Sequence, residues 1–358
     1  FIRMRFTGTS VKAVIANHKN YWTDYMGYIL DGRQDKFALD DQSEERCYTI
    51  AEDLEDTMHD LLLFKRKDSC HTITFYGFEV DAGAKLGEVP VLPTRKMEVF
   101  GDSVSCGEVS EAVEYVGKPD PQHDGEYSNS WYSYSWITAR KLNAQLHITS
   151  QGGIALLDHT GWFHGPDYVG MESCYDKIEY NDECGPVKPW DFSLYQPNLV
   201  VVAFGQNDSN PEDYMAKDYN GEKAKHWRAR YRAFVEHLME LYPAAHFILA
   251  TTILGHDKSW DDAIDEVTKE IGSDRVSHFL YSKNGVGTPG HIRIPEAEQF
   301  QIVGGGELAD AWNDFTDRLR LDDLFFSGGV ISLSFSFVPM LLFHVFRSAY
   351  DFAENTYN

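Results

Sequence analysis

The sequence predicts an α/β protein in which a doubly wound parallel-sheet domain follows a small β-sandwich. Residues 1–88 hold short segments of alternating polarity between polar turns, as antiparallel strands do. From residue 95 onward, near-continuous apolar runs alternate with amphipathic stretches, which indicates a parallel sheet with helices on both faces. We therefore expect a jelly-roll sandwich over residues 1–90, an α/β domain over 93–310 and a C-terminal tail over 311–358.

The first region alternates apolar and polar side chains in several places. Phe1–Phe6, Val11–Ile15 and Thr72–Val80 each show the period of two that marks a half-buried strand. The stretch Gly83–Pro93 then carries two prolines and no such pattern. It is the predicted linker between the two domains.

In the second region, three apolar runs predict buried parallel strands. They are Lys96–Phe100, Gln145–Thr149 and Asn198–Phe204, and each ends in glycine and polar residues. Lys223–Leu241 places its aromatic and leucine side chains on one helical face. Ligands of such sheets bind beyond the carboxyl ends of the strands, so the polar residues that follow each run are candidates for a site.

Charge and cysteine usage narrow the classes of function. The sequence has 32 Lys and Arg residues and 56 Asp and Glu residues, so its net charge is −24. That charge repels nucleic acid and anionic membrane surfaces and suits a neutral substrate. The five cysteines form no CxxC pair, which argues against a zinc ribbon or a disulfide-dense scaffold. We expect reduced thiols, with one disulfide between Cys174 and Cys184, the nearest pair, left open.

The tail contains an uncharged apolar segment, Leu324–Phe346, that is long enough to cross a bilayer. Two adjacent glycines, Pro339 and a stretch of alternating polarity favour instead a strand or an interface segment, packed on the protein or on another copy of it. A homo-oligomer formed through this tail is therefore one interpretation. The first residues lack the apolar core of a signal peptide, and we leave open a cytoplasmic protein or one secreted after processing.

Three polar groups at predicted strand ends suggest acyl-transfer chemistry. Gly101-Asp102-Ser103 would present the Ser103 hydroxyl and N–H at the edge of the sheet. A Gly152 or Gly153 N–H and the Asn207 side-chain amide follow the next two strands. Together they would supply three donors for a developing oxyanion.

A serine nucleophile needs a base, and His291 is the candidate. It lies in a Gly- and Pro-rich loop after the last predicted strand. His147, His159 and His164 lie near the second strand, but no carboxylate at ligand spacing accompanies them. We therefore predict no metal and no other cofactor.

Several stretches together resemble the block pattern of SGNH hydrolases. They include FGDSVSCG (100–107), SQGGIAL (150–156), NLVVVAFGQND (198–208) and GHIRIPEAEQ (290–299). The chain is most similar to the family 2 carbohydrate esterases, which join an N-terminal jelly roll to an SGNH domain of flavodoxin-like architecture. The resemblance covers roughly residues 93–305.

The resemblance implies that Ser103 is the nucleophile, that His291 is the base, and that Ser103, Gly152 and Asn207 form the oxyanion hole. Members of the family remove acetyl groups from plant cell-wall polysaccharides such as xylan or mannan, through an acetyl-enzyme. The expected partner is an acetylated polysaccharide or oligosaccharide. Members have a cleft lined by aromatic side chains, for which the candidates here are Trp162, Tyr168 and Trp190.

One position departs from the pattern of many SGNH enzymes. They place an aspartate three residues before the histidine, where this chain has Thr288. Either a backbone carbonyl or a distant carboxylate would then orient His291. Two rival functions also remain: a lipid or short-chain acyl esterase, and a carbohydrate-binding protein without catalysis.

Overall fold

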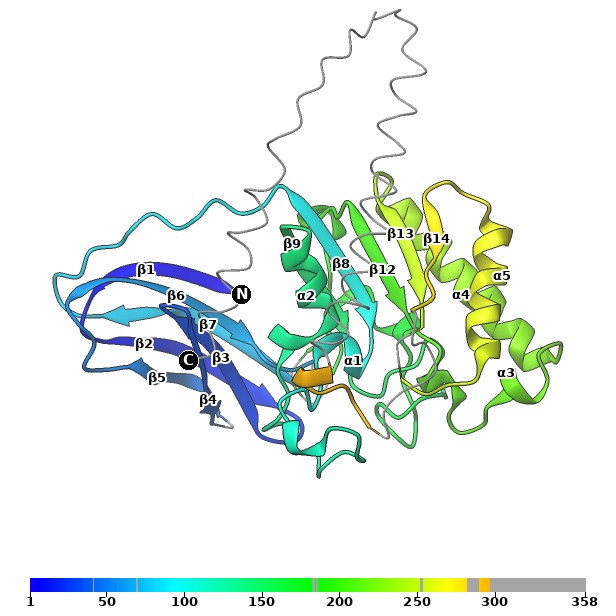
Figure 1. The fold of residues 1–358 in the computed structure, drawn as a ribbon, viewed down its shortest axis with the longest axis horizontal. Helices are drawn as coiled ribbons and strands as arrows, with labels where there is room; N and C mark the ends of the chain where they lie inside the picture. Colours follow the sequence, from blue (N-terminus) through cyan, green and yellow to red (C-terminus); the bar gives the residue numbers. More distant parts are fainter. Residues whose placement is uncertain are drawn as a thin grey trace, which may run out of the picture.

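The computed structural model describes residues 1–40, 42–68, 70–181, 184, 186–251, 254–281 and 290–296. Two units lie side by side in it, an antiparallel sandwich and a parallel α/β unit (Figure 1). The tail over 311–358, its apolar segment and Thr288 all lie outside the described residues. Within the described ranges, no helix combines the length and the apolar character needed to span a membrane.

The sandwich consists of two antiparallel sheets that share one core. One sheet has the order β1-β6-β3-β4 and the other β5-β2-β7. Its core combines inward-facing residues of both sheets, among them Phe6, Ile15 and Leu63, all fully buried. The strands are β1 (Ile2–Gly8), β2 (Val11–Lys19), β3 (Asp24–Leu30), β4 (Arg33–Leu39), β5 (Gln42–Ala51), β6 (Thr57–Lys65) and β7 (His71–Val80).

The α/β unit is built on a five-stranded parallel sheet with the order β9-β8-β12-β13-β14. In chain order this is 2-1-3-4-5, a doubly wound sheet that switches direction between its first and third strands. The crevice therefore opens at the carboxyl ends of β8 and β12. The strands are β8 (Arg95–Gly101), β9 (Ala144–Ser150), β12 (Leu199–Ala203), β13 (His246–Ala250) and β14 (Val276–His278).

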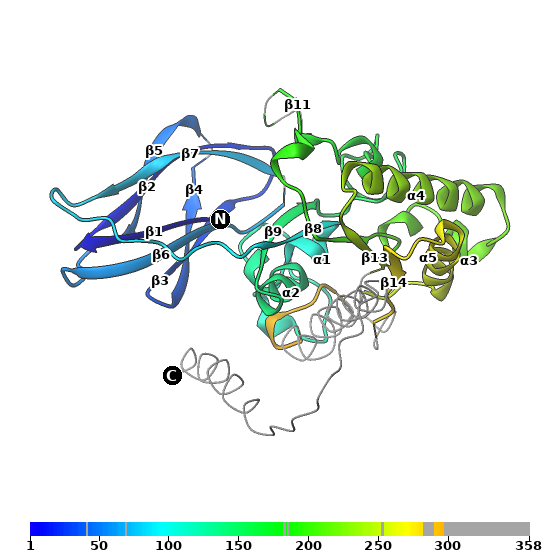
Figure 2. The ribbon, with the colours of Figure 1, turned by 90° about the horizontal axis from the view of Figure 1, so that it is seen from above.

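Helices cover both faces of this sheet. Alternate residues of β12 point to opposite sides: Val200 packs with α4 and α5, and Val201 packs in the cluster that includes residues of α2. Figure 2 shows α4 and α2 on opposite sides of the strands. The helices are α1 (Ser103–Cys106), α2 (Tyr134–Lys141), α3 (Tyr214–Lys217), α4 (Glu222–Leu241) and α5 (Lys258–Ile271); β10 (Lys177–Glu179) pairs with β11 (Lys188–Pro189).

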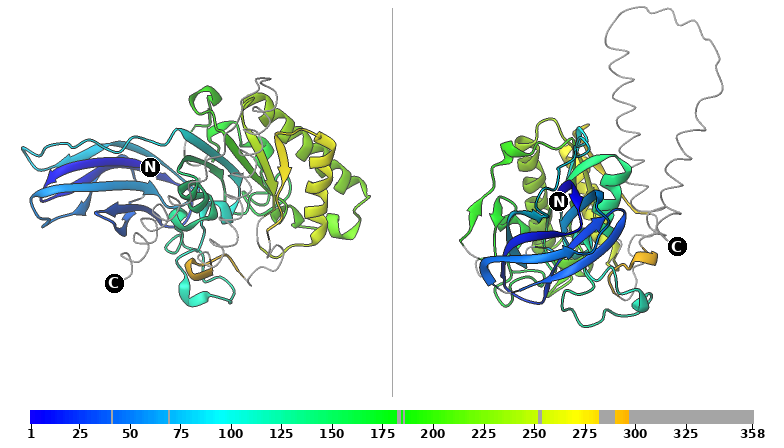
Figure 3. Two further views of the ribbon diagram at one scale, coloured as in Figure 1. Left: turned by 45° about the horizontal axis from the view of Figure 1, so that its top comes forward. Right: turned by 90° about the vertical axis from the view of Figure 1, so that its left-hand side faces the viewer.

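The loop after β6 makes contacts between the sandwich and the α/β unit. Figure 3 shows the two units against each other in two further views. Arg66 is only 1% exposed, and its guanidinium donates to Glu111 at 2.5 Å and to the Ser128 carbonyl at 3.0 Å. The stretch from 83 to 93 runs along β1, where the Gly87 N–H donates to the Arg5 carbonyl. We propose that the two domains divide within this stretch. All five cysteines are free thiols, so the Cys174–Cys184 disulfide is not formed.

We predict that Arg66→Met destabilises the protein by about 2 kcal/mol in chemical denaturation, because it leaves the half-buried Glu111 carboxylate without its buried partner. Arg3→Met is the matched control. Arg3 pairs with Asp60 at 2.8 Å on the exposed sandwich surface, where a salt bridge contributes about 1 kcal/mol or less. Equal effects of the two substitutions would contradict a stabilising role for the Arg66 contact.

Candidate active site

Ser103 stands where the first strand of the sheet ends and α1 begins. Asp102 caps this helix, and its Oδ1 accepts the Val104 N–H at 3.0 Å. Gly101 permits the tight turn, because a Cβ there would lie 2.0 Å from the Ser105 hydroxyl. The turn thus presents the Ser103 side chain at the carboxyl end of β8.

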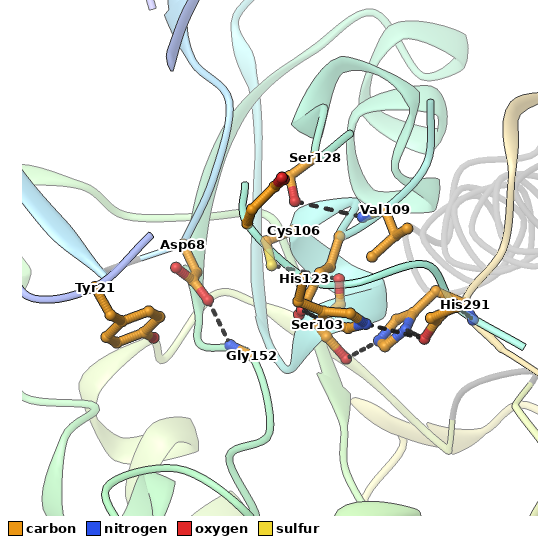
Figure 4. A network of polar contacts seen from close by, with 12 residues as sticks. Tyr21, Asp68, Ser103, Cys106, Val109, His123, Ser128, Gly152 and His291 are labelled. Atoms are coloured by element: carbon orange, nitrogen blue, oxygen red, sulfur yellow. Dashed lines mark hydrogen bonds and ion pairs between the residues drawn. The ribbon is translucent and has the colours of Figure 1, made fainter. Parts of the chain in front are cut away.

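His291 reaches the serine from a loop 188 residues later in the chain. Its Nε2 lies 2.8 Å from the Ser103 Oγ, and its Nδ1 lies 2.7 Å from Asp120 Oδ2 (Figure 4). The other Asp120 oxygen accepts the His291 backbone N–H at 2.9 Å and pairs with Arg293 at 2.8 Å. A carboxylate accepts, so Nδ1 carries the proton and Nε2 is left to accept the serine proton. Of the two alternatives for orienting His291, the structure has the distant carboxylate.

The charges around this group follow from burial and hydrogen bonding. Burial lowers the pKa of His291, but the hydrogen bond to Asp120 and the charges of Glu108 and Asp120 outweigh it, so the pKa is raised. Burial acts in the opposite direction on Asp120, whose pKa falls well below its usual range because His123 and His291 donate to it. Burial raises the pKa of Asp102 to about 7.

The predicted oxyanion donors lie at this edge, but two of the three already have partners. The Gly152 N–H donates to Asp68 Oδ2 at 2.7 Å, a contact drawn in Figure 4. The Asn207 amide donates to Asp102 Oδ2 at 3.1 Å and to the Ile154 carbonyl at 3.0 Å. Both groups are therefore engaged by protein acceptors in this structure, and the three-donor oxyanion hole stays a prediction. The Ser103 N–H makes no hydrogen bond to another described residue.

The three predicted aromatic residues do not form one group. Trp162 is 64% exposed, and its backbone N–H donates to the Gly153 carbonyl at 2.8 Å, which places it beside the loop of Gly152 and Gly153. Tyr168 belongs to the same long loop after β9 and packs on Gly165. Trp190 instead lies beside the ring of His147, with the ring centroids 5.0 Å apart and the planes tilted by 54°. His147 is in the middle of β9, away from the carboxyl end of that strand. The structure separates Trp190 from the edge where Ser103 lies.

Sequence reasoning missed the residues that surround His291. Glu108, Asp120 and His123 come from the loop that follows α1, and Asp68 comes from the sandwich. None of them directly follows a strand of the parallel sheet, where the ligands of such sheets bind. The composition of residues 117–125 (GKPDPQHDG) gave a weak signal, since it gathers two aspartates and a histidine in a turn-rich stretch.

Two side-chain groups have donor atoms close enough for a metal ion: Asp120, His123 and His291, and the buried Asp24, Cys70 and His71. In the first, protein hydrogen bonds already engage the carboxylate and both imidazoles. In the second, the Lys67 ammonium lies 3.6 Å from Asp24 and supplies the balancing positive charge. We assign a metal to neither. His147, His159 and His164 form no such group within the described residues.

Comparison with known proteins shows what this chain is similar to. A family model described as carbohydrate esterase 2 N-terminal matches residues 1–90. An acetylxylan esterase / glucomannan deacetylase of Cellvibrio japonicus is 32% identical over 197 residues, which cover 54% of this chain and 50% of that protein. The chain is thus similar to family 2 carbohydrate esterases, in its sandwich through the family model and beyond it through this relative.

Further family 2 relatives extend the match. The cellulase/esterase CelE of Acetivibrio thermocellus is 29% identical over 247 residues, 68% of this chain and 27% of that protein. The chain thus spans about a quarter to a half of the curated relatives it matches. A family two carbohydrate esterase from Clostridium thermocellum, solved with cellohexaose, shares the fold with a TM-score of 0.70 at 23% identity, over 87% of this chain and 92% of that one.

We predict that Gly152→Ala lowers the stability of the protein by about 1–3 kcal/mol in thermal unfolding. A Cβ at this position would lie 2.7 Å from a Glu108 oxygen and 2.9 Å from an Asp68 oxygen, so both buried carboxylates would have to move. Gly255→Ala is the control, because no atom of the described residues lies within 4 Å of its added Cβ. Wild-type stability of the Gly152 variant would show that the loop adapts without cost.

Proposed function

We propose that this protein is a serine esterase that removes O-acetyl groups from neutral polysaccharides, such as acetylated xylan or glucomannan, or from their oligosaccharides. The observation that carries the proposal is the 2.8 Å contact between Ser103 Oγ and His291 Nε2. Nucleophile and base at hydrogen-bond distance, with the base oriented by a third group, are the arrangement of serine hydrolases. The similarity to an acetylxylan esterase / glucomannan deacetylase supports the acetyl ester as substrate.

In the proposed reaction, Ser103 Oγ attacks the carbonyl carbon of the acetyl ester while His291 Nε2 takes its proton. The resulting imidazolium keeps its Nδ1–H on Asp120, 2.7 Å away, and then protonates the sugar oxygen as the C–O bond breaks. Water attacks the acetyl-enzyme by the same route. It gives its proton to His291, and acetate leaves as the proton returns to Ser103.

The oxyanion needs donors in place when the tetrahedral intermediate forms. We propose that the Ser103 N–H, at the start of α1, is the first of them, since it has no other partner in the described part of the chain. The Gly152 N–H can join it only if the oxyanion replaces Asp68 as its acceptor. The Asn207 side-chain amide can join it only if the oxyanion replaces the Ile154 carbonyl or Asp102 as its acceptor.

The charge of the protein and the exposed Trp162 both fit a neutral sugar polymer. A surface with a net charge of −24 does not repel a neutral chain, whereas it does repel the acetate product. The Trp162 ring is 64% exposed on the loop that carries Gly152 and Gly153. An exposed indole on this loop offers an apolar face to a pyranose ring.

We predict that Ser103→Ala lowers acetate release from acetylated xylan at least about 1000-fold, because the covalent step loses its nucleophile. The control is Ser193→Ala, an exposed serine that precedes β12 and so lies at the opposite edge of the sheet. Assays on acetylated xylan, acetylated glucomannan and longer-chain esters define the substrate. Full activity of the Ser103 variant would refute the proposal, and a preference for long acyl chains would move it to lipid esters.

We predict that Asp120→Asn lowers kcat by about 100- to 10,000-fold with little change in KM, because the amide no longer fixes the Nδ1–H tautomer of His291. Asp124→Asn, an exposed aspartate of the same loop, is the control. Steady-state kinetics at several pH values measure both parameters. A kcat within twofold of wild type would mean that another group orients the histidine.

A further inference from the structure

A second histidine, His123, lies beside the base and belongs to the same hydrogen-bonded chain. Its Nδ1 is 2.6 Å from Glu108 Oε1, and its Nε2 is 3.2 Å from Asp120 Oδ2, the oxygen that also accepts His291 Nδ1–H. The two imidazole rings meet edge to face with centroids 5.6 Å apart. The contacts therefore run without a break from Glu108 through His123, Asp120 and His291 to Ser103 (Figure 4 labels the two histidines and the serine).

The identity of its two partners fixes the charge of His123. A neutral imidazole has one donor and one acceptor nitrogen, whereas ionised carboxylates only accept. Both ring nitrogens of His123 face carboxylate oxygens, so both must carry a proton. The hydrogen bonds to Asp120 and Glu108 accordingly raise the pKa of His123 to about 10. Burial alone would raise the pKa of Glu108, but the hydrogen bond from His123 keeps it below its usual value.

We propose that His123 is a positioning residue of the catalytic group: a permanent imidazolium that holds Asp120 against His291 and offsets the two carboxylates nearest the base. The inference rests on the proposed esterase function. Without this cation, Arg293 would still pair with Asp120 and Lys67 would still act on Glu108, but the positive charge between the two carboxylates would be lost. Both negative charges favour the protonated form of the base, which cannot accept the serine proton.

The other charged groups around the chain come from several elements. Arg293 pairs with Asp120 from the His291 loop at 2.8 Å, and Asp102 faces His291 from the end of β8. From the sandwich, Lys67 acts on Glu108, and the Asp68 carboxylate lies with that of Glu108 against Gly152. None of these makes a ring contact with His291, as His123 does.

The consequence concerns the pKa of His291. With the His123 cation present, this pKa is lower than Asp120 and Glu108 alone would make it. His291 must be neutral to act, so kcat/KM falls as the pH drops through the pKa of His291. The positive charge of His123 lowers this pKa. A charge within about 6 Å shifts a pKa by about 1 unit or more, so removing it should move the acid limb of the pH–rate profile upward.

The test compares His123→Gln with His123→Lys in pH profiles of kcat/KM on an acetyl ester. His123→Gln keeps a hydrogen-bonding side chain without the charge, and we expect the midpoint of its acid limb to rise by about 1 pH unit. Activity well below both midpoints then falls about tenfold. His123→Lys restores a cation between the two carboxylates, and we expect its midpoint within about 0.3 unit of wild type, as for His237→Gln, an exposed histidine of α4.

A loss of activity in His123→Gln that is uniform across pH, with an unmoved midpoint, overturns the proposal and leaves His123 a scaffold residue. The midpoints of the two variants rising together would overturn it as well, because charge would not be the cause. Neither result touches the esterase function, which stands or falls with Ser103→Ala.

A measurement on the wild-type protein does not depend on how the variants fold. Imidazole nitrogen shifts, with the His123 signals assigned by through-bond correlation to its backbone in the wild-type protein, should show His123 doubly protonated and unchanged from pH 5 to pH 8. This follows from its pKa of about 10. A titration of His123 near its ordinary pKa of about 6.5 would overturn the proposal even if every variant were unstable.

Discussion

The geometry of the site depends on one half-buried carboxylate, that of Asp120. It receives the His291 ring and backbone N–H groups, the Arg293 guanidinium and the His123 ring, so its desolvation is fully compensated. These contacts bind the loop after α1 to the loop that carries His291, 171 residues later. Without Asp120, the base would have neither a fixed tautomer nor a fixed distance to Ser103.

The sandwich takes part in the same arrangement rather than standing apart from it. Arg66 anchors the loop after β6 to Glu111 and to the Ser128 carbonyl, which places Asp68 on the Gly152 N–H. A residue of one unit thus holds the glycine loop of the other. The price of this contact is that the Gly152 N–H is engaged before substrate arrives, so binding must exchange one acceptor for another.

The sequence predicted what periodicity and strand ends encode. The runs that became β8, β9 and β12 placed Ser103, Gly152 and Asn207 at one edge, because parallel strands end there together. The sequence could not show Asp120 as the partner of His291, since long-range hydrogen bonds leave no periodic signal. The stretch 130–142 has a helical pattern in the sequence, but the structure divides it at Ser133, whose hydroxyl accepts the Trp136 N–H at 3.3 Å and caps the start of α2. Trp190 packs beside His147, a placement that the sequence could not show because it depends on long-range packing.

The most direct test of the account is to capture the acetyl-enzyme. Wild-type protein mixed with an activated acetyl ester, quenched in acid within the first turnover and digested, should carry one acetyl group on the peptide that contains Ser103. The same treatment of protein inactivated at Ser103 by a fluorophosphonate should leave that peptide without it. Steady release of acetate with no acetylated peptide, or with the acetyl group on another residue, would contradict the Ser103–His291–Asp120 mechanism.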